Sequence, residues 1–140
     1  MRSTERLTRL HRDTILDLVV LVGQRCDRLF DEKIQGIEAK RVQADEIWGF
    51  VEKKEKRKKP TDGDKVGDAY TFVGIEAQTK LILCFELGRR DYACTGRFIK
   101  KLERATSGRF QLTTDGFVPY IGAIEDTFGA DIDFAQLIKV

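Results

Sequence analysis

The chain has 140 residues, of which 41% are hydrophobic and 34% charged, and its formal net charge is +2. This length and composition favour one soluble globular domain with a hydrophobic core and a heavily charged surface. A membrane span is excluded because no run of about 18 apolar residues occurs, and the basic N-terminus lacks the uninterrupted apolar stretch of a secretory signal.

Two helices are predicted at the N-terminus, over residues 3–10 and 13–31. Asp13 or Thr14 is a suitable N-cap for the second helix. The apolar residues of this second helix recur three and four positions apart, so they share one stripe of its surface. They are Ile15, Leu18, Val19, Val22, Cys26, Leu29 and Phe30.

The turn between these helices carries Arg9, His11 and Arg12. One interpretation is the end of a helix-turn-helix, whose second helix offers its first residues to DNA. The other is an ordinary helical hairpin, which has the same apolar pattern. After the second helix the apolar content thins, and Gly36 marks a linker. We therefore expect a helical arm over residues 1–40 and a separate region over residues 41–140.

Residues 42–51, VQADEIWGFV, form the central predicted strand, because the segment is short and rich in β-branched and aromatic residues. Trp48 and Phe50 are expected in the core. Asp45 interrupts this run, and a carboxylate in a buried strand is costly unless a cation or hydrogen bonds compensate. Asp45 therefore indicates either a divalent metal ligand or the end of an edge strand.

A basic run, KKEKRKK, follows this strand directly. It is either a solvated loop or a phosphate-binding segment, and only the second alternative needs a polyanionic partner. The acidic residues that come next fit a glycine-rich turn better than a calcium loop, since the final acidic ligand of such a loop is missing. The candidate DNA-binding residues of the run are Lys53, Lys54, Lys56, Arg57, Lys58 and Lys59.

The remaining elements predict a mixed sheet. Strands over residues 69–77 and 80–87 are separated by a short turn and form an antiparallel hairpin. Arg89 and Arg90 precede a helix that stops near Gly108, a strand covers 110–114, a helix begins at Pro119, and a last strand covers 132–140. This order predicts an α/β fold with a mixed five-stranded sheet and flanking helices, in which the first and fourth strands are neighbours.

That topology brings Asp45 and Asp115 to one pocket, although they lie far apart in the chain. Two carboxylates repel unless a positive charge lies between them, and Mg²⁺ or Mn²⁺ supplies that charge through oxygen ligands. A pair of such ions promotes in-line displacement at a phosphodiester. Glu46 is expected on the opposite face of its strand, and Glu125 and Asp126 on a helix, so no third ligand is apparent.

Three segments carry a resemblance to a known family: QADEIWGFVEKK, GDAYTFVGIEAQTKLILCFELGRRD and TTDGFVPYIGAIEDTFGADIDFAQLIKV. They resemble the DDE transposases of bacterial insertion sequences, most closely the IS-one type, over nearly the whole chain. The resemblance implies a ribonuclease-H-like fold, preceded by a DNA-binding zinc and helix-turn-helix region of which only the last part is present. It also implies that Asp45 and Asp115 are the first two catalytic, metal-binding acids.

The third acid of that family, a glutamate on a helix after the fifth strand, has no counterpart in residues 1–140. The resemblance therefore implies a truncated transposase that binds insertion-sequence ends and target DNA but does not cleave or join DNA alone. Partners would be DNA and either a full-length transposase or a second copy. Arg89 and Arg90 are further candidate DNA contacts. The alternative is a non-catalytic, DNA-binding or regulatory transposase fragment.

The cysteines agree with a cytoplasmic location. Cys26, Cys84 and Cys94 are odd in number and match no zinc or redox spacing. They are expected to be reduced thiols that mostly serve packing.

Overall fold

The computed structural model describes residues 1–138, and Lys139 and Val140, the end of the predicted last strand, lie outside the described residues. Its contacts divide into two units, Met1–Gln35 and Gly36–Val140. Each unit is described by itself. No helix among the described residues is both long enough and apolar enough to cross a membrane.

The first unit consists of the two predicted helices, α1 (Arg2–Thr8) and α2 (Arg12–Lys33). The expected cap on Asp13 or Thr14 is wrong. His11 is the N-cap, because its ring Nδ1 accepts a hydrogen bond from the backbone N–H of Asp13 at 3.3 Å. The predicted apolar stripe is exposed apart from Ile15, which is buried, and Phe30, which is half-buried; Val19 and Val22 are each 57% exposed.

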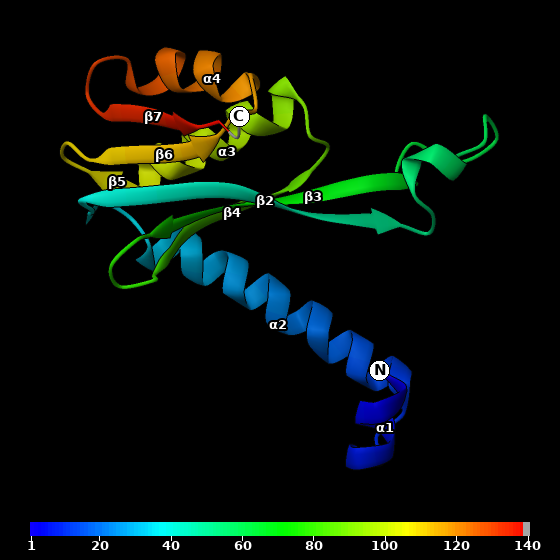
Figure 1. The fold of residues 1–140 in the computed structure, drawn as a ribbon. Coiled ribbons are helices and arrows are strands. Elements are labelled where there is room, and N and C mark those ends of the chain that lie inside the picture. Colours follow the sequence, from blue (N-terminus) through cyan, green and yellow to red (C-terminus); the bar gives the residue numbers. More distant parts are fainter. Residues whose placement is uncertain (139–140) are drawn as a thin grey trace. The chain divides into compact units, whose positions relative to one another are not determined.

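The second unit is built on a five-stranded sheet of order β4-β3-β2-β6-β7 (Figure 1). β2, β3 and β4 run antiparallel, whereas β2, β6 and β7 run parallel. This order and these directions define a ribonuclease-H-like α/β fold, which confirms the predicted fold class. The strands are β2 (Arg41–Val51), β3 (Gly67–Glu76), β4 (Ile82–Gly88), β6 (Gln111–Asp115) and β7 (Asp133–Leu137).

A second, two-stranded parallel sheet joins β1 (Ile37–Glu38) to β5 (Thr106–Ser107). The sequence predicts only a linker where β1 lies. Gly36 strengthens this junction, because its backbone N–H donates to the carbonyl of Arg104 at 3.2 Å. The segment before β2 is therefore tied to the end of the helix that precedes β6.

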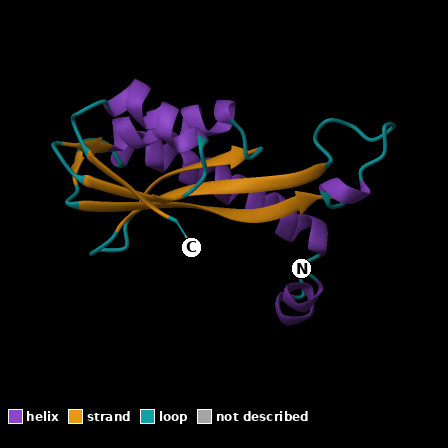
Figure 2. Ribbon diagram, turned by 45° about the horizontal axis from the view of Figure 1, so that its top comes forward, coloured by secondary structure: helices purple, strands orange, loops and turns teal. Residues whose placement is uncertain are grey.

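The predicted helices α3 (Tyr92–Ala105) and α4 (Pro119–Phe128) lie on one face of the sheet (Figure 2). Asp91 caps α3 by accepting from the backbone N–H of Cys94 at 2.8 Å, and Pro119 opens α4. Alternate residues of the strands face these helices and form the core. The largest fully buried side chains are Tyr120, Phe72, Phe98, Leu83, Ile99, Leu102, Leu112 and Val42.

The outer part of β2 is not in this core, which corrects the expectation for Trp48 and Phe50. Their side chains are 45% and 49% exposed, and their rings contact each other with centroids 5.8 Å apart. β6 pairs with β2 only from Arg41 to Gln43, so the rest of β2 has β3 as its single strand neighbour. The two strands continue as a two-stranded ribbon beyond the covered sheet (Figure 1).

The packing role expected for the cysteines holds for two of them. Cys84 and Cys94 are buried, whereas Cys26 is exposed. Burial raises the pKa of the Cys84 thiol to about 12, so this residue stays protonated at neutral pH.

Candidate metal centre

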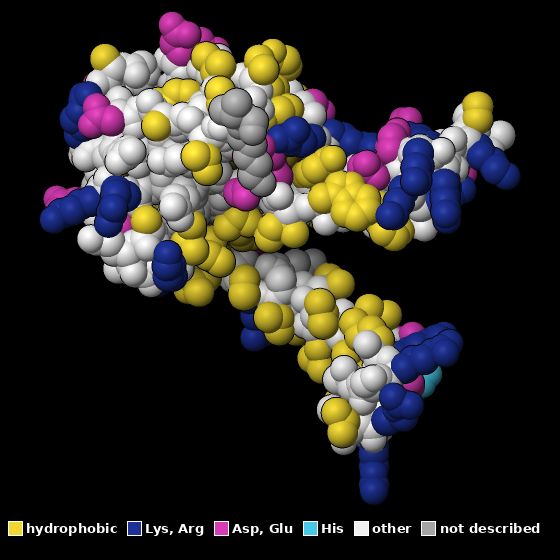
Figure 3. Space-filling view, in the orientation of Figure 1, with side chains coloured by type: hydrophobic (Ala, Val, Ile, Leu, Met, Phe, Trp, Pro, Cys, Tyr) yellow, Lys and Arg dark blue, Asp and Glu magenta, His cyan; other side chains and the backbone are white. Residues whose placement is uncertain are grey.

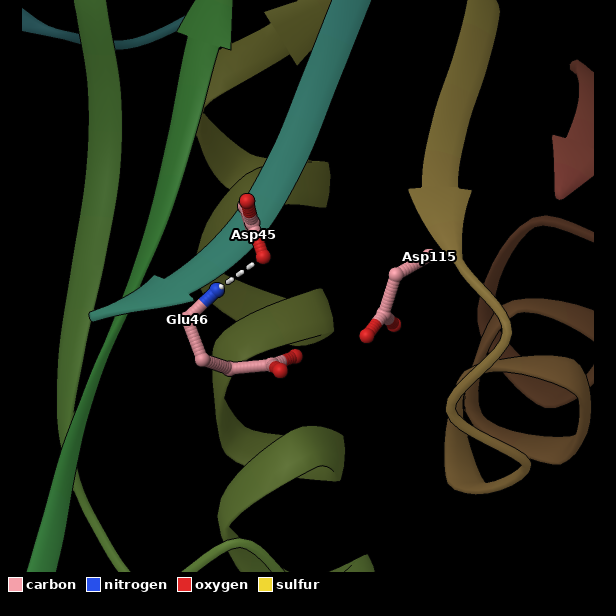
Figure 4. Close-up of side chains that lie close together, drawn as sticks. All are labelled: Asp45, Glu46 and Asp115. Carbon is pink, nitrogen blue, oxygen red and sulfur yellow. Dashed lines mark hydrogen bonds between the residues drawn. The ribbon is translucent and has the colours of Figure 1, made fainter. Parts of the chain in front are cut away.

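Asp45 and Asp115 are brought together by the register of β2 and β6. The paired residues run from Arg41 opposite Gln111 to Gln43 opposite Thr113, and the same register carried two residues further sets Asp45 beside Asp115. Pairing stops before that point, and the two strands part. Figure 4 shows Asp45 on β2 and, across the resulting gap, Asp115 at the end of β6 with its carboxylate turned toward β2. Oxygens of Asp45, Asp115 and Glu46 lie within 4.8 Å of one another.

The backbone around Asp115 fixes its position at the end of β6. One carboxylate oxygen, Oδ1, accepts a hydrogen bond from the backbone N–H of Phe117 at 3.0 Å. The Asp115 carbonyl accepts from the side-chain amide of Gln136, on β7, also at 3.0 Å. The Asp115 side chain keeps 42% of its surface exposed, so a ligand can reach it.

Glu46 belongs to this cluster, although the alternation of the strand predicts otherwise. Its backbone N–H donates to Asp45 Oδ1 at 2.8 Å, and its side chain crosses the gap toward Asp115 (Figure 4). The side chain is 3% exposed. Its Oε2 accepts from Arg90, while the buried Oε1 has no hydrogen-bond partner among residues 1–138.

Arg90 is the cation of the cluster. Its Nε lies 2.9 Å from Glu46 Oε2, and one terminal nitrogen lies 2.8 Å from Asp115 Oδ2. The guanidinium also stacks over the Phe117 ring, 3.9 Å from the centroid. Desolvation by itself lowers the pKa of Arg90, but the hydrogen bond to Glu46 and the charges of Glu46 and Asp115 outweigh it and raise that pKa above its usual value.

Tyr120 lies under the cluster, on the face of the sheet that the helices cover. The residue is fully buried, and its hydroxyl has no hydrogen-bond partner within the described part of the chain. Burial raises the pKa of this phenol, and its hydrogen-bonding interaction with the Glu46 carboxylate and the charges of Glu46, Asp115 and Asp45 raise it further. A neutral hydroxyl is thus held next to the Glu46 carboxylate. No sequence pattern singles out Tyr120; only the fold places it there.

The donors suit a hard divalent cation, since all three side chains offer carboxylate oxygens. Their oxygens lie within 4.8 Å of one another, so one ion could be held by all three side chains. A hollow of about 1120 Å³ adjoins the cluster, lined by Asp45, Arg90, Asp115 and side chains of the uncovered sheet face, which leaves room for a ligand.

The basic run lies at the tip of the β2–β3 ribbon, away from the carboxylates, where Lys and Arg side chains gather beside a hydrophobic patch (Figure 3). Part of it is engaged within the chain: Lys53 Nζ lies 2.9 Å from Asp62 Oδ1, and Lys54 lies over the Trp48 ring. A 3-10 turn, η1 (Glu55–Arg57), follows. Lys56, Arg57 and Lys59 are exposed, and Lys58 is half-buried.

Arg89 and Arg90 are neighbours in sequence but serve different places. Arg89 donates to the Glu55 carboxylate at 2.7 Å and to three carbonyls of the segment that leads into β3. Those carbonyls belong to Asp64, Val66 and Asp68. Arg89 thus stabilises the loop before β3, and Arg90 pairs with the carboxylates of Glu46 and Asp115. The other candidate DNA contacts, Arg9, His11 and Arg12, lie in the first unit, with the His11 ring used as a helix cap.

Comparison with known proteins gives distant structural likenesses only. No family model matches the chain, and no curated protein matches it in sequence. The chain is similar to part of the piggyBac transposase, solved by cryo-electron microscopy as a synaptic complex with hairpin DNA. That match has a TM-score of 0.48 and 13% identity, and it covers 74% of this chain but only 24% of that one. It is too distant to assign a function, and the fold class rests on the strand order.

Proposed function

We propose that the chain is the catalytic core of a DDE-type DNA transposase, with Asp45 and Asp115 as its first two metal-binding acids. The observation that carries this proposal is the meeting of these two carboxylates at the gap between the parallel strands β2 and β6. The motifs around them, QADEIWGF and TTDGF, favour transposases of insertion sequences of the IS-one type over other ribonuclease-H-like nucleases.

The reaction would be cleavage of a phosphodiester and strand transfer at insertion-sequence ends. Bound Mg²⁺ or Mn²⁺ would activate the attacking hydroxyl and stabilise the leaving oxygen. Asp45 and Asp115 hold their oxygens at the site from two strands, and the Phe117 N–H keeps one Asp115 oxygen in place. By the resemblance, a further glutamate is required that residues 1–140 do not supply at the family's position. The isolated chain is therefore expected not to join DNA.

DNA is the proposed partner, held through its phosphates by the basic residues of the ribbon tip. Charge complementarity supports this, because Lys56, Arg57 and Lys59 are exposed together. Binding is then expected to fall steeply between low and moderate salt. A flat salt dependence would leave these residues as ordinary solvated charges. Competition between insertion-sequence ends and random DNA tests whether the protein recognises particular ends.

The test of the two acids compares Asp45→Asn and Asp115→Asn with Asp126→Asn, a matched control in the exposed part of α4. We expect both site variants to weaken Mn²⁺ binding while DNA binding in a gel shift stays near wild type, and the control to change neither. Wild-type Mn²⁺ affinity in both site variants would refute the metal centre. Robust Mg²⁺-dependent nicking by the isolated chain, lost in Asp45→Asn, would refute only its expected inactivity.

One observation favours the alternative of a non-catalytic DNA-binding or regulatory protein. Arg90 already pairs with Glu46 and Asp115, so two of the three carboxylates have a cationic partner within the chain. Under this alternative the chain binds DNA, itself or a complete transposase. Salt-sensitive DNA binding without any Mn²⁺ binding would select it.

A further inference from the structure

We infer that Glu46 is a third carboxylate ligand of the metal centre and that Arg90 is the cation which the metal displaces. This inference rests on the proposed function, because it assumes that a divalent ion binds Asp45 and Asp115. It assigns a role to a residue that lies next to Asp45 in the chain but on the opposite face of the strand.

The gap between β2 and β6 explains how Glu46 reaches the site. Where two strands are paired, side chains of successive residues stay on opposite faces of the sheet. Pairing of β2 with β6 ends at Gln43, so at Glu46 no strand separates the two faces on that side. A glutamate is long enough to extend sideways into the opening, and Figure 4 shows its carboxylate pointing toward Asp115.

Burial points to a missing partner for Glu46. Its side chain is 3% exposed, and Oε1 is buried without a hydrogen-bond partner among the described residues, while Arg90 holds only Oε2. A buried carboxylate oxygen without a partner costs free energy of folding. An ion between Glu46, Asp45 and Asp115 would remove this cost, because their oxygens are already within 4.8 Å of one another.

Formal charge leads to the same conclusion. Three carboxylates and the guanidinium of Arg90 leave a formal excess of two negative charges at the cluster. A divalent cation that takes the place of Arg90 leaves an excess of only one negative charge, so it compensates the three carboxylates better than Arg90 does. Displaced from the carboxylates, the guanidinium still has the Phe117 ring as a partner, which lowers the cost of its release.

Tyr120 acts here as a positioning residue. Its buried hydroxyl lies beside Glu46 and has no other hydrogen-bond partner in the described chain. A small rotation of the hydroxyl or the carboxylate lets Tyr120 donate to one Glu46 oxygen and leaves the other for the ion. Partners of this kind orient metal ligands, and their loss commonly weakens metal binding about 10–100-fold.

The experiment measures Mn²⁺ binding to the purified chain without DNA, by the loss of the free-ion electron paramagnetic resonance signal. Glu46→Gln keeps the size of the side chain and its ability to accept from Arg90, but removes the charge. We expect it to weaken binding at least about tenfold. Arg90→Ala is expected to strengthen binding, since the competing cation is gone.

The matched control is Glu86→Gln. Glu86 is also a strand carboxylate that pairs with an arginine, Arg97, but it lies outside the cluster. Its Mn²⁺ affinity should equal that of the wild type. Near-UV circular dichroism and the thermal midpoint identify any variant that has lost its fold. Tyr120→Phe perturbs Glu46 more mildly. It is expected to weaken Mn²⁺ binding by a smaller factor than Glu46→Gln does.

The outcomes separate this inference from the proposed function. Weak binding in Asp45→Asn with wild-type binding in folded Glu46→Gln would overturn the role of Glu46 and leave the two-acid centre intact. Wild-type binding in both variants would overturn both proposals. Unchanged or weaker affinity in folded Arg90→Ala would overturn the displacement of Arg90 by the metal.

Discussion

The two halves of β2 both carry apolar residues but have different surroundings. The inner half, up to Glu46, carries Val42 and Ala44 in the core, where they are 1% and 4% exposed. The outer half carries the larger Trp48 and Phe50, and these are about half exposed. Both halves pair with β3, but only the inner half lies beside β6 and under the helices.

This contrast shows that burial along a strand is decided by the neighbouring elements. An apolar residue enters the core only where a helix covers its face, and the outer half of β2 extends beyond that cover. The same boundary creates the site. Asp45 and Glu46 lie where the pairing with β6 has ended, so their carboxylates turn into the gap instead of stacking against a strand.

The largest expected effect comes from removing one phenylalanine from each side of this boundary. Phe72, opposite Glu46 on β3, is fully buried against Phe98 and Tyr120. Phe72→Ala should lower the free energy of unfolding by about 3–5 kcal/mol, because it leaves a cavity. Phe50→Ala should cost less than about 1 kcal/mol, because its ring is already half exposed. Urea unfolding measures both, and equal losses would mean that the outer half is also packed.

The neighbours of the inner half of β2 can be predicted from the sequence. Alternation and turn spacing are local signals, and together with the connection rules they suffice for a topology in which the first and fourth predicted strands are neighbours and Asp45 and Asp115 meet in one pocket. The length of the pairing between β2 and β6 is not a local signal. For that reason the sequence sets Glu46 correctly on the face opposite Asp45 but does not reveal that its carboxylate reaches the cluster. It also wrongly predicts Trp48 and Phe50 in the core, and it gives no sign of Tyr120. His11 as a cap is missed because histidine is not among the preferred N-cap residues.

A second, smaller effect separates the adjacent arginines. Arg89→Ala removes the donor to Glu55 and to three carbonyls around the start of β3. We expect the free energy of local unfolding of this segment to fall by about 1–2 kcal/mol through the lost hydrogen bonds to the carbonyls, while the exposed pair with Glu55 adds little. Trypsin should then cleave the basic run several times faster, with the sites identified by mass spectrometry.

Arg90→Ala is the matched control for this measurement, because Arg90 contacts the carboxylate cluster and not the basic loop. It should leave cleavage of the basic run at the wild-type rate. Equal acceleration in both variants would indicate that the ribbon and the sheet open as one cooperative unit. It would contradict the view that the two halves of β2 are stabilised separately.

The smallest effect is a pH dependence confined to the ribbon tip. The hydrogen bond from Arg89 lowers the pKa of Glu55 below its ordinary value of 4.5, and the one from Lys53 lowers that of Asp62 below 3.8. Because the folded pKa values lie below the unfolded ones, the stabilisation is complete above about pH 4.5 and is lost as pH falls through the lowered values. Trp48, the single tryptophan, lies beneath Lys54 and reports the change by fluorescence.

Arg89→Ala should shift the acid transition upward in pH, toward the ordinary value for Glu55. An unchanged transition in that variant would show that the Arg89 contact does not hold the tip, and that the outer half of β2 depends on β3 alone.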